Sequence, residues 1–208
     1  MTAAAVAAAA PAHDARLVAA AAAGDVNLVK QLLGAGASVH ARDAQGRTAL
    51  VAATYGNHVM TARALVAAGA DVNAQDELRN SAFLLAGARG YLEIVRLALA
   101  HGADLRSTNR YGGTALIPAC HYGHVETVRE LLATRIDVDH VNNLGWTALL
   151  EAIILGDGGT RHTEIVRLLI AANANVNLAD RQGVTPLAHA RSRGQPAIAR
   201  LLENAGAR

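Results

Sequence analysis

Apolar and polar residues recur along this chain in blocks that repeat every 33 residues. The segment TALIPACHYGHVETVRELL, from Thr114 to Leu132, carries the block in full, and the other copies follow its order of residue types. Counting back 33 residues from Thr48 reaches Ala15, two residues before Leu17, where a sixth and degenerate copy begins. A fixed period of this size predicts a stacked array of repeats rather than one globular core. The opening residues of the remaining copies are spaced by 33, 33, 33 and 38 residues, and they are Thr48, Ser81, Thr114, Thr147 and Thr185.

Each copy of the block predicts two short helices. The opening Thr or Ser can accept a hydrogen bond from a free backbone N–H and so cap the first helix. The large apolar residue two positions further on is Leu17, Leu50, Phe83, Leu116, Leu149 or Leu187. Alanine follows the opening position by five residues in every copy, at Ala20, Ala53, Ala86, Ala119, Ala152 and Ala190. An alanine repeated in one slot predicts that neighbouring helices approach too closely for a larger side chain.

Glycine or asparagine marks the ends of the predicted helices. The turn between the two helices falls at Gly24, Asn57, Gly90, Gly123 and Gly194. The second helix ends at Gly36, Gly69, Gly102, Arg135, Asn173 and Gly206. Glycine and asparagine tolerate the left-handed conformation that ends a short helix. Arg135 is the exception, and a left-handed arginine at this position is expected to cost about 1 kcal/mol.

The repeated block resembles the ankyrin repeat, whose pattern is D-x-x-G-x-T-P-L-H-x-A-A-x-x-G-H. The agreement is closest from Asp180 to Leu187 and from Asp43 to Leu50, and it extends over residues 14–208. The resemblance implies an all-α repeat solenoid of about six helix-turn-helix repeats with short β-hairpin fingers. The chain is similar to the stand-alone ankyrin-repeat proteins of bacteria, some of which are exported to the periplasm. The copies are expected at about residues 14–42, 43–75, 76–108, 109–141, 142–179 and 180–208.

Several departures from the ankyrin pattern carry their own expectations. The histidine of T-P-L-H is absent from every copy, so apolar contacts are expected to replace its bridging role. Arg79 stands where the finger usually has glycine, and Pro118 falls too early in its helix to kink it. Copy 5 is five residues longer than the others, with the excess near residues 156–161. This insertion is expected on the surface, either as a plain extended turn or as a functional loop.

Composition restricts the class of partner. The net charge is +2 at pH 7, and the basic residues are spread along the chain without a run of five like charges. This distribution argues against an arm for nucleic acid or for a membrane surface. No apolar run reaches the roughly 18 residues that a membrane-spanning helix needs. The chain is therefore expected to bind no nucleic acid and not to insert into a membrane. We also expect a monomer that binds another protein and needs no cofactor.

Residues 1–13 form an alanine-rich segment with two interpretations. Ala3 to Ala10 is a short apolar run, and Ala10, Pro11 and Ala12 match a small-x-small cleavage site. In the first interpretation the segment is the remnant of an export signal, and the protein is periplasmic. In the second it is a helix that caps the first repeat of a cytoplasmic protein, since no Lys or Arg precedes the apolar run. N-terminal processing of the full-length gene product separates the two.

Candidate chemistry in the sequence is sparse. Cys120 is the single cysteine, so no internal disulfide is expected. Cys120, His121 and His124 make a candidate metal site, but zinc needs a third or fourth ligand in tetrahedral geometry. The ankyrin alignment instead implies a buried helix slot for Cys120 and a Gly-His turn for His124, so no metal is expected. No G-x-S-x-G, H-E-x-x-H or phosphate-loop motif occurs, and the chain is expected not to be an enzyme.

The aromatic residues indicate a binding surface. The chain has six of them, and four fall in slots that the resemblance assigns to the concave groove. These slots are the finger tips and the last turn of each first helix, which also include Ile154 and Leu155 in copy 5. Tyr, Trp and Arg are the residue types that dominate interface hot spots. We expect the groove to bind another protein through Arg110, Tyr111, His121, Tyr122, Leu144, Trp146, Leu78, Arg89 and Tyr55.

Two alternatives to groove binding stay open from the sequence. Tyr111 and Trp146 can instead pack on adjacent fingers and stiffen them. A periplasmic module can also bind a peptide or solute at the 156–161 loop rather than in the groove. Replacing Trp146 and Tyr122 by alanine separates binding from stiffening, because only stiffening predicts a loss of fold.

Overall fold

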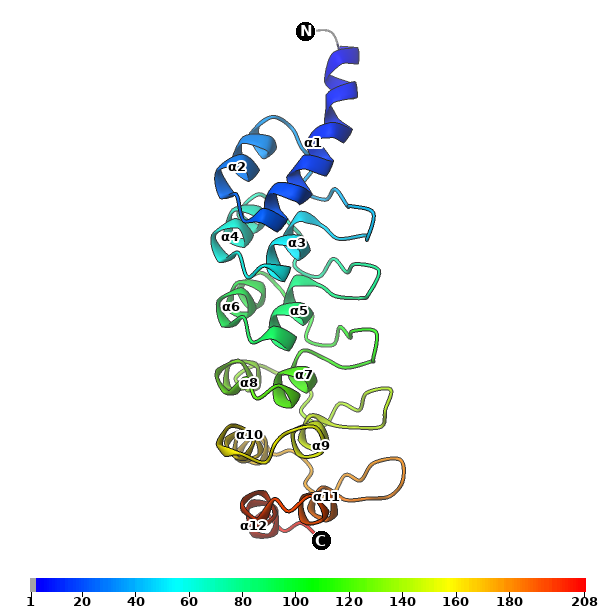
Figure 1. Ribbon diagram of the computed structural model, residues 1–208, viewed down its shortest axis with the longest axis vertical. Helices are drawn as coiled ribbons and strands as arrows, with labels where there is room; N and C mark the ends of the chain where they lie inside the picture. Colours follow the sequence, from blue (N-terminus) through cyan, green and yellow to red (C-terminus); the bar gives the residue numbers. More distant parts are fainter. Residues whose placement is uncertain (1–2) are drawn as a thin grey trace. The chain divides into compact units, whose positions relative to one another are not determined.

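The computed structural model describes residues 3–208, with side chains described from residue 12 onward. It contains twelve α-helices and no β-strand in that range, and an isolated β-bridge joins Arg42 and Thr48 (Figure 1). The chain forms two compact units. The first unit comprises residues up to 86 together with 93–104, and the second comprises residues 87–92 together with 105–208. Each unit is a stack of helix pairs.

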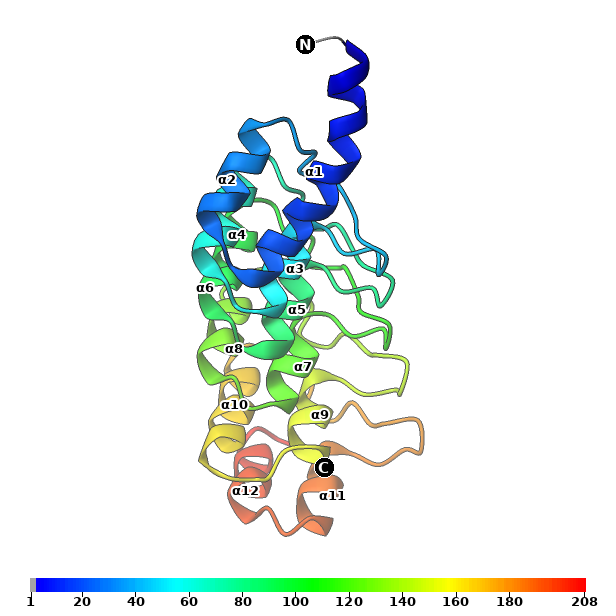
Figure 2. The same cartoon turned by 45° about the horizontal axis from the view of Figure 1, so that its top comes forward.

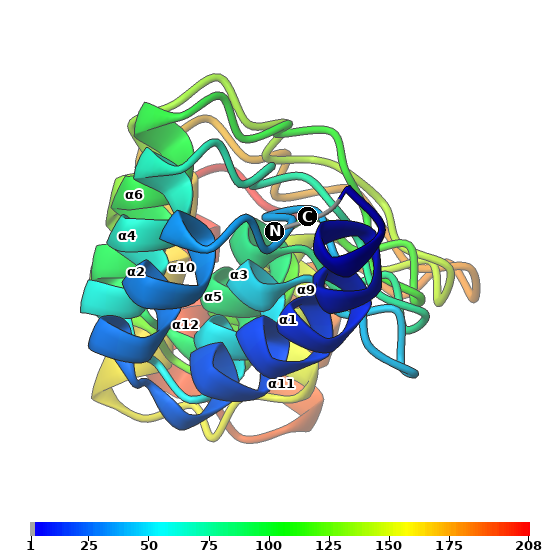
Figure 3. The same ribbon diagram turned by 90° about the horizontal axis from the view of Figure 1, so that it is seen from above.

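The first unit begins with a long helix that replaces the first helix of copy 1. This helix, α1, runs without interruption through residue 13 and packs against α2 and α3. Figure 3 shows α2 and α4 in one layer, beside the layer of α1 and α3. The buried side chains Leu17, Leu50 and Leu65 fill the space between them. The helices of this unit are α1 (Ala3–Ala23), α2 (Val26–Gly34), α3 (Ala49–Tyr55), α4 (Val59–Ala67) and most of α5 (Ala82–Arg89) and α6 (Leu92–Ala100).

The second unit stacks three complete helix pairs. The first helices α7, α9 and α11 pack on one another, and the second helices α8, α10 and α12 do the same (Figures 1 and 2). The loops that lead into α9 and α11, which are the fingers, project on the side away from the second helices. The six helices are α7 (Leu116–His121), α8 (Val125–Leu132), α9 (Ala148–Ile154), α10 (Thr160–Ala171), α11 (Pro186–Ser192) and α12 (Pro196–Asn204).

The predicted helix caps form in four copies and fail in one. Thr48, Ser81, Thr147 and Thr185 each accept a hydrogen bond from the backbone N–H three residues on, at 3.2 to 3.3 Å. The buried hydroxyl of Thr114 has no hydrogen-bond partner. The reason lies four residues further on, where Pro118 has no N–H to bond the carbonyl of Thr114 and close the first helical turn. The helix of this copy therefore begins later, at Leu116.

The prediction of a left-handed Arg135 is wrong. In the described part of the chain, the residues other than glycine with positive φ are Asn57, Arg79 and Asn173. Copy 4 closes its second helix through Thr134 instead. The hydroxyl of Thr134 donates to the carbonyl of Leu131 at 2.6 Å and accepts from Ile136 N–H at 3.2 Å. Because these side-chain bonds stabilise the turn, Arg135 does not need the left-handed conformation.

The fingers differ from the β-hairpins that the family resemblance implies. Each has two backbone bonds, such as Asp43 N–H to Arg47 O at 3.1 Å across the base and Gly46 N–H to Asp43 O at 3.0 Å in the turn. Ladder pairing is confined to the isolated bridge in the described residues. A side chain replaces the missing ladder. The Oδ1 atom of the first finger residue accepts from the backbone N–H groups two and four residues on. The residues in this anchor position are Asp43, Asp76, Asn109, Asn142 and Asp180.

The insertion in copy 5 is shared between a helix and a loop. By the repeat alignment, Thr163 is the equivalent of Val125, where α8 begins, yet α10 begins at Thr160. Three of the added residues therefore lengthen the second helix. The rest widen the loop before it, where Asp157 Oδ1 accepts from Gly159 N–H at 2.9 Å. The insertion lies on the surface as expected, with Asp157 65% exposed.

Candidate protein-binding surface

The finger before α7 presents an arginine and a tyrosine that hold each other in place. Tyr111 is 54% exposed, and its ring lies 4.7 Å from the guanidinium carbon of Arg110. The Arg110 guanidinium also donates to the Tyr111 hydroxyl at 2.6 Å. The backbone under them is fixed by Asn109 Oδ1, which accepts from Tyr111 N–H at 2.9 Å. Both side chains were predicted in the groove, and both reach solvent.

The next finger is tied to this one through its backbone. Asn143 N–H donates to the carbonyl of Tyr111 at 2.9 Å, which places the two finger tips side by side. Leu144 follows at the tip with 51% of its surface exposed. Trp146 is half-buried beside the anchor Asn142, which accepts its backbone N–H at 3.1 Å. Leu144 and Trp146 therefore lie on the finger that adjoins the finger of Tyr111.

The end of α7 contributes two stacked rings. The rings of His121 and Tyr122 lie 4.2 Å apart at 14°, and Tyr122 is 55% exposed. His121 Nδ1 lies 3.8 Å from Glu151 Oε2, on the adjacent first helix α9. We name the six residues that the structure brings together here the aromatic face: Arg110, Tyr111, His121, Tyr122, Leu144 and Trp146.

Glu151 is a residue of this site that the sequence reasoning missed. It is 6% exposed, and its Oε1 accepts from Asn142 Nδ2 at 2.8 Å. Burial raises the pKa of Glu151 to about 7, and the bond from Asn142 opposes part of that rise. The signal was available, because its slot in the first helix holds Ala52, Leu85 and Pro118 in the preceding copies. A carboxylate in a slot that otherwise holds uncharged residues could have marked Glu151 as unusual.

The pKa values of two groups near Glu151 are shifted as well. Burial lowers the pKa of His121, and the imidazole of His162 adds to the effect. Burial raises the pKa of the Cys120 thiol well above its usual value, and the Glu151 carboxylate adds to the rise. Both shifts favour the uncharged forms of His121 and Cys120.

The histidines of the Gly-His slot hydrogen-bond to the backbone of the preceding copy. His58 Nε2 lies 3.1 Å from Ala22 O, and His162 Nε2 lies 2.8 Å from His121 O. His124 likewise hydrogen-bonds to the backbone of Ala88. Each bond joins a second helix to the first helix of the copy before it. Among the residues with described side chains, no group of three His, Cys, Asp or Glu residues is arranged to hold a metal ion.

The remaining predicted residues fall outside the aromatic face. Leu78 is 47% exposed and belongs to the first unit, as does the half-buried Tyr55. Arg89 is exposed at the end of α5, in the second unit. Ile154, assigned from the sequence to the groove, is 7% exposed. That assignment is wrong, because the last turn of α9 turns Ile154 inward and leaves Leu155 outside, 42% exposed.

The 156–161 loop makes hydrogen bonds of its own. His162 is only 4% exposed, and its Nδ1 lies 2.7 Å from Asp157 Oδ1. Since His162 Nε2 must donate to the carbonyl of His121, Nδ1 of a neutral imidazole accepts from the Asp157 backbone N–H. A bond from Nδ1 to the Asp157 carboxylate requires a second proton on the ring. Hydrogen bonds to Gly159 and His162 lower the pKa of Asp157. The loop is thereby fastened to α10.

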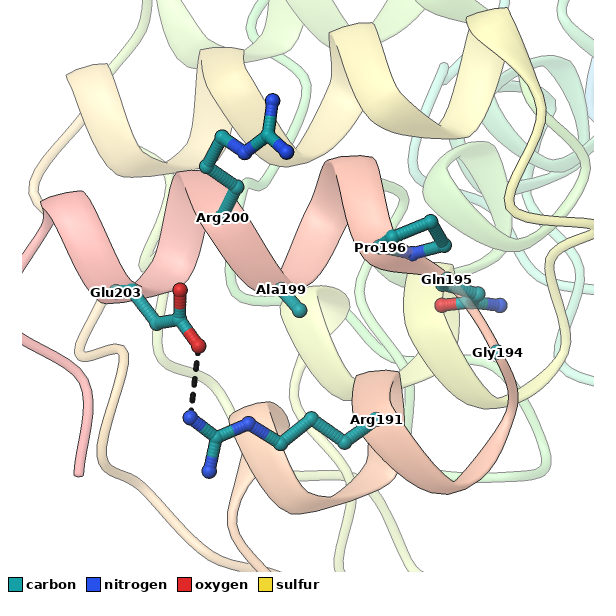
Figure 4. A pocket seen from close by; sticks show the side chains of 7 residues that line it. All are labelled: Arg191, Gly194, Gln195, Pro196, Ala199, Arg200 and Glu203. Atoms are coloured by element: carbon teal, nitrogen blue, oxygen red, sulfur yellow. Dashed lines mark hydrogen bonds and ion pairs between the residues drawn. The ribbon is translucent and has the colours of Figure 1, made fainter.

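A separate hollow of about 340 Å³ lies between α11 and α12 (Figure 4). Arg191 faces Glu203 across it, with a nitrogen-to-oxygen distance of 2.7 Å. Gln195 lines the other end, and its Nε2 donates to the carbonyl of Ile153 at 3.0 Å. None of these residues belongs to the aromatic face.

Comparison with known proteins identifies the family. A family model described as ankyrin repeats (3 copies) matches residues 17–109, 82–160 and 142–208. The crystal structure of an ankyrin repeat domain from Acinetobacter baumannii AYE is 57% identical, with a TM-score of 0.90 over 93% of this chain and 98% of that one. The ankyrin repeat protein EF0377 is 38% identical, with a TM-score of 0.87 over 90% of this chain and 96% of that one.

A curated relative matches over a shorter stretch. The putative ankyrin repeat protein YahD of Escherichia coli (strain K12) is 51% identical over 57 residues, which is 27% of this chain and 28% of that protein. This chain belongs to the ankyrin-repeat family. The membership and the all-α repeat class expected from the sequence are thus confirmed. In the described residues, no helix combines the length and the apolar character that crossing a membrane requires.

Proposed function

We propose that this protein binds another protein through the aromatic face, and that it does so without catalysis. Ankyrin repeats are generally protein–protein interaction modules. The observation that carries the proposal is the exposure of Tyr111, Tyr122 and Leu144, each more than half exposed on adjoining elements. Exposed apolar side chains gathered on one surface mark interaction sites more often than chance placement does.

The arrangement of the aromatic face supports binding at low entropic cost. Arg110 is held over Tyr111, and His121 is stacked on Tyr122, before any partner arrives. Side chains that are already ordered lose little freedom on association. Tyr, Trp and Arg also supply most of the binding energy in typical interfaces. The face therefore has both the residue types and the order of a hot-spot cluster.

Paired alanine variants test this proposal. In Tyr122→Ala with Trp146→Ala, we expect capture of partner proteins from native-cell extract to be lost, with far-UV circular dichroism nearly unchanged. The matched control is Met60→Ala, since Met60 is 68% exposed on α4 of the first unit. Capture that is equal in the double variant and the wild type contradicts the proposal. Loss of helical signal in the double variant supports the stiffening alternative instead.

The compartment and the monomeric state stay predictions. Helix α1 spans residue 13 without a break, so the backbone has no boundary at the end of the predicted N-terminal segment. The export-signal interpretation concerns residues 1–12, of which Met1 and Thr2 lie outside the described residues. Mass spectrometry of the N-terminus of the native protein tests export, and sedimentation of the purified protein tests the monomer.

A further inference from the structure

We propose that the segment bound by the aromatic face is acidic, with Asp or Glu side chains flanking apolar ones. This inference rests on the proposed function, because it names the partner chemistry of the same surface. It is carried by two features of the second unit. One is a set of arginines without carboxylate partners around the face, and the other is the burial of Glu151, the carboxyl at its centre, against Asn142.

The arginines occupy repeat slots that flank the apolar residues. The slot after the last turn of the first helix holds Arg89, Tyr122, Leu155 and Arg193 in successive copies. Two exposed apolar side chains thus lie between two exposed arginines. All four residues belong to the second unit, where the first helices α7, α9 and α11 pack in order. The slot forms a row with an apolar middle and a cation at either end.

The finger tips repeat this arrangement. Arg110 and Arg181 hold the same tip slot, with Asn143 in the copy between them. The Arg181 side chain lies against Gly145 of the intervening finger, since a Cβ on Gly145 would lie 2.5 Å from Arg181 Cγ. The next tip slot holds Tyr111 and Leu144, which are 54% and 51% exposed. Cations therefore flank apolar side chains on the fingers as well.

Four arginines flank the apolar residues in these two rows, at Arg89, Arg110, Arg181 and Arg193. In the described part of the chain, none of the four has a carboxylate within ion-pair distance. The second helices of the same unit behave differently. Arg129 lies 3.2 Å from Glu164, and Arg167 lies 2.6 Å from the same carboxylate. Arginine stays protonated in proteins, so a row of unpaired guanidinium groups is a fixed positive charge.

Carboxylates near the aromatic face are bonded to groups other than these arginines. Glu151 is buried, bonded to Asn142, and its pKa is raised to about 7. Asp157, in the neighbouring loop, lies 2.7 Å from His162, and Asp180 lies 2.7 Å from His189. Complementary charge on a partner would pair the guanidinium groups that lack a carboxylate, and apolar side chains would cover Tyr111 and Leu144. An acidic and apolar protein segment meets both requirements.

Selection from a peptide library tests the inference. A display library of random peptides is panned on the intact protein, and recovered sequences are expected to be enriched in Asp, Glu and apolar residues. The strongest peptide is then measured against Arg110→Glu with Arg181→Glu, where we expect binding to weaken by about tenfold or more. Its affinity should also fall as salt is raised. The matched control is Arg200→Glu, an exposed arginine of α12 outside the face.

The outcomes separate the inference from the proposed function. Recovered peptides rich in Lys and Arg, or equal binding by the Arg110→Glu and Arg181→Glu variant, would overturn the acidic partner. If such peptides still fail to bind Tyr122→Ala with Trp146→Ala, the aromatic face remains the docking surface. Failure to recover any peptide that depends on Tyr122 and Trp146 overturns both. Displacement of an acidic peptide by a single-stranded oligonucleotide or by anionic vesicles, at lower concentration than by unlabelled peptide, counts against a protein partner.

Discussion

The corresponding surfaces of the two units treat their aromatic residues in opposite ways. In the first unit, the Tyr55 hydroxyl donates to Asp76 Oδ2 at 3.1 Å and accepts from Asn80 Nδ2 at 3.0 Å. Tyr55 is half-buried as a result. In the second unit, Tyr122 is 55% exposed and stacks only on rings of its own turn region. Tyr55 aligns with His121, one position before the slot of Tyr122, and it serves internal packing, whereas Tyr122 faces solvent.

The finger anchors explain part of this difference. Asp43 and Asp76 carry charge in the first unit, and Asp43 pairs with Arg47 at 2.7 Å. The equivalent anchors Asn109 and Asn142 keep the Oδ1 that accepts two backbone N–H groups but carry no charge. The fold of the finger is therefore preserved while its carboxylate is removed. The finger of Arg110 therefore offers no anchor carboxylate, whereas the anchor carboxylate of the last finger, Asp180, lies 2.7 Å from His189.

Removing core volume should affect both units strongly and alike. Leu50 and Leu149 hold the same slot and are each 1% exposed. We expect Leu50→Ala and Leu149→Ala each to lower the free energy of unfolding by about 2–5 kcal/mol, because each leaves a cavity in a packed helix layer. Denaturant unfolding of the two variants measures this. A large effect in one unit only would show that the two cores are not equivalent.

Glu151 makes the stability of the second unit depend on pH. Its pKa is about 7 when folded and near 4.5 when unfolded, so between these values the folded protein binds more protons. The free energy of unfolding then falls as pH rises from about 4.5 to 7, by on the order of 1–3 kcal/mol. In Glu151→Gln this decline should disappear, as thermal unfolding at pH 5 and pH 8 would reveal. His121, Cys120 and Asn142 face Glu151 and stay unchanged in the variant.

A control on an exposed carboxylate sharpens the pH experiment. Glu126 on α8 is exposed, and Glu126→Gln should retain the wild-type decline. If Glu151→Gln also retains the full decline, the buried carboxyl is not its source. The pKa of Glu151 would then not be raised, and its carboxylate would stay charged at the centre of the aromatic face.

Removing single hydroxyl groups should separate the two tyrosines. Tyr55→Phe loses two hydrogen bonds and is expected to cost about 1 kcal/mol of stability. Tyr122→Phe should leave stability unchanged, because its hydroxyl has no partner among the residues described. Thermal unfolding of both variants measures the difference. Equal losses would contradict the distinction between an internal and an exposed tyrosine.

The smallest expected effect comes from restoring charge to an anchor. Asn109→Asp keeps the acceptor for Tyr111 N–H and Gly113 N–H, so stability should hardly change. It adds a negative charge beside Arg110, and we expect an acidic peptide to bind about threefold more weakly. Fluorescence titration measures this, with Asp43→Asn in the first unit as the control that should leave affinity unaltered. Stronger binding by Asn109→Asp would speak for a basic partner.

The sequence determined the repeat architecture because its evidence is local and periodic. Helix caps, turn glycines and the invariant alanine recur at fixed spacing, so each copy specifies the same pair of helices. The period also placed Tyr111, Tyr122 and Leu144 at exposed positions. It failed at Thr114 and Arg135, where Pro118 and Thr134 changed the local hydrogen bonding within single copies.

Only the tertiary structure decided which side chains became a site. The carboxyl of Glu151 acquires its raised pKa from burial and from a contact with Asn142, nine residues away in sequence. The hydrogen bond of Tyr55 to Asp76 and the burial of Ile154 likewise depend on neighbours from other segments. Desolvation and charge pairing are properties of distances between segments. A one-dimensional pattern states which residue types are available, and the packing of the chain sets those distances.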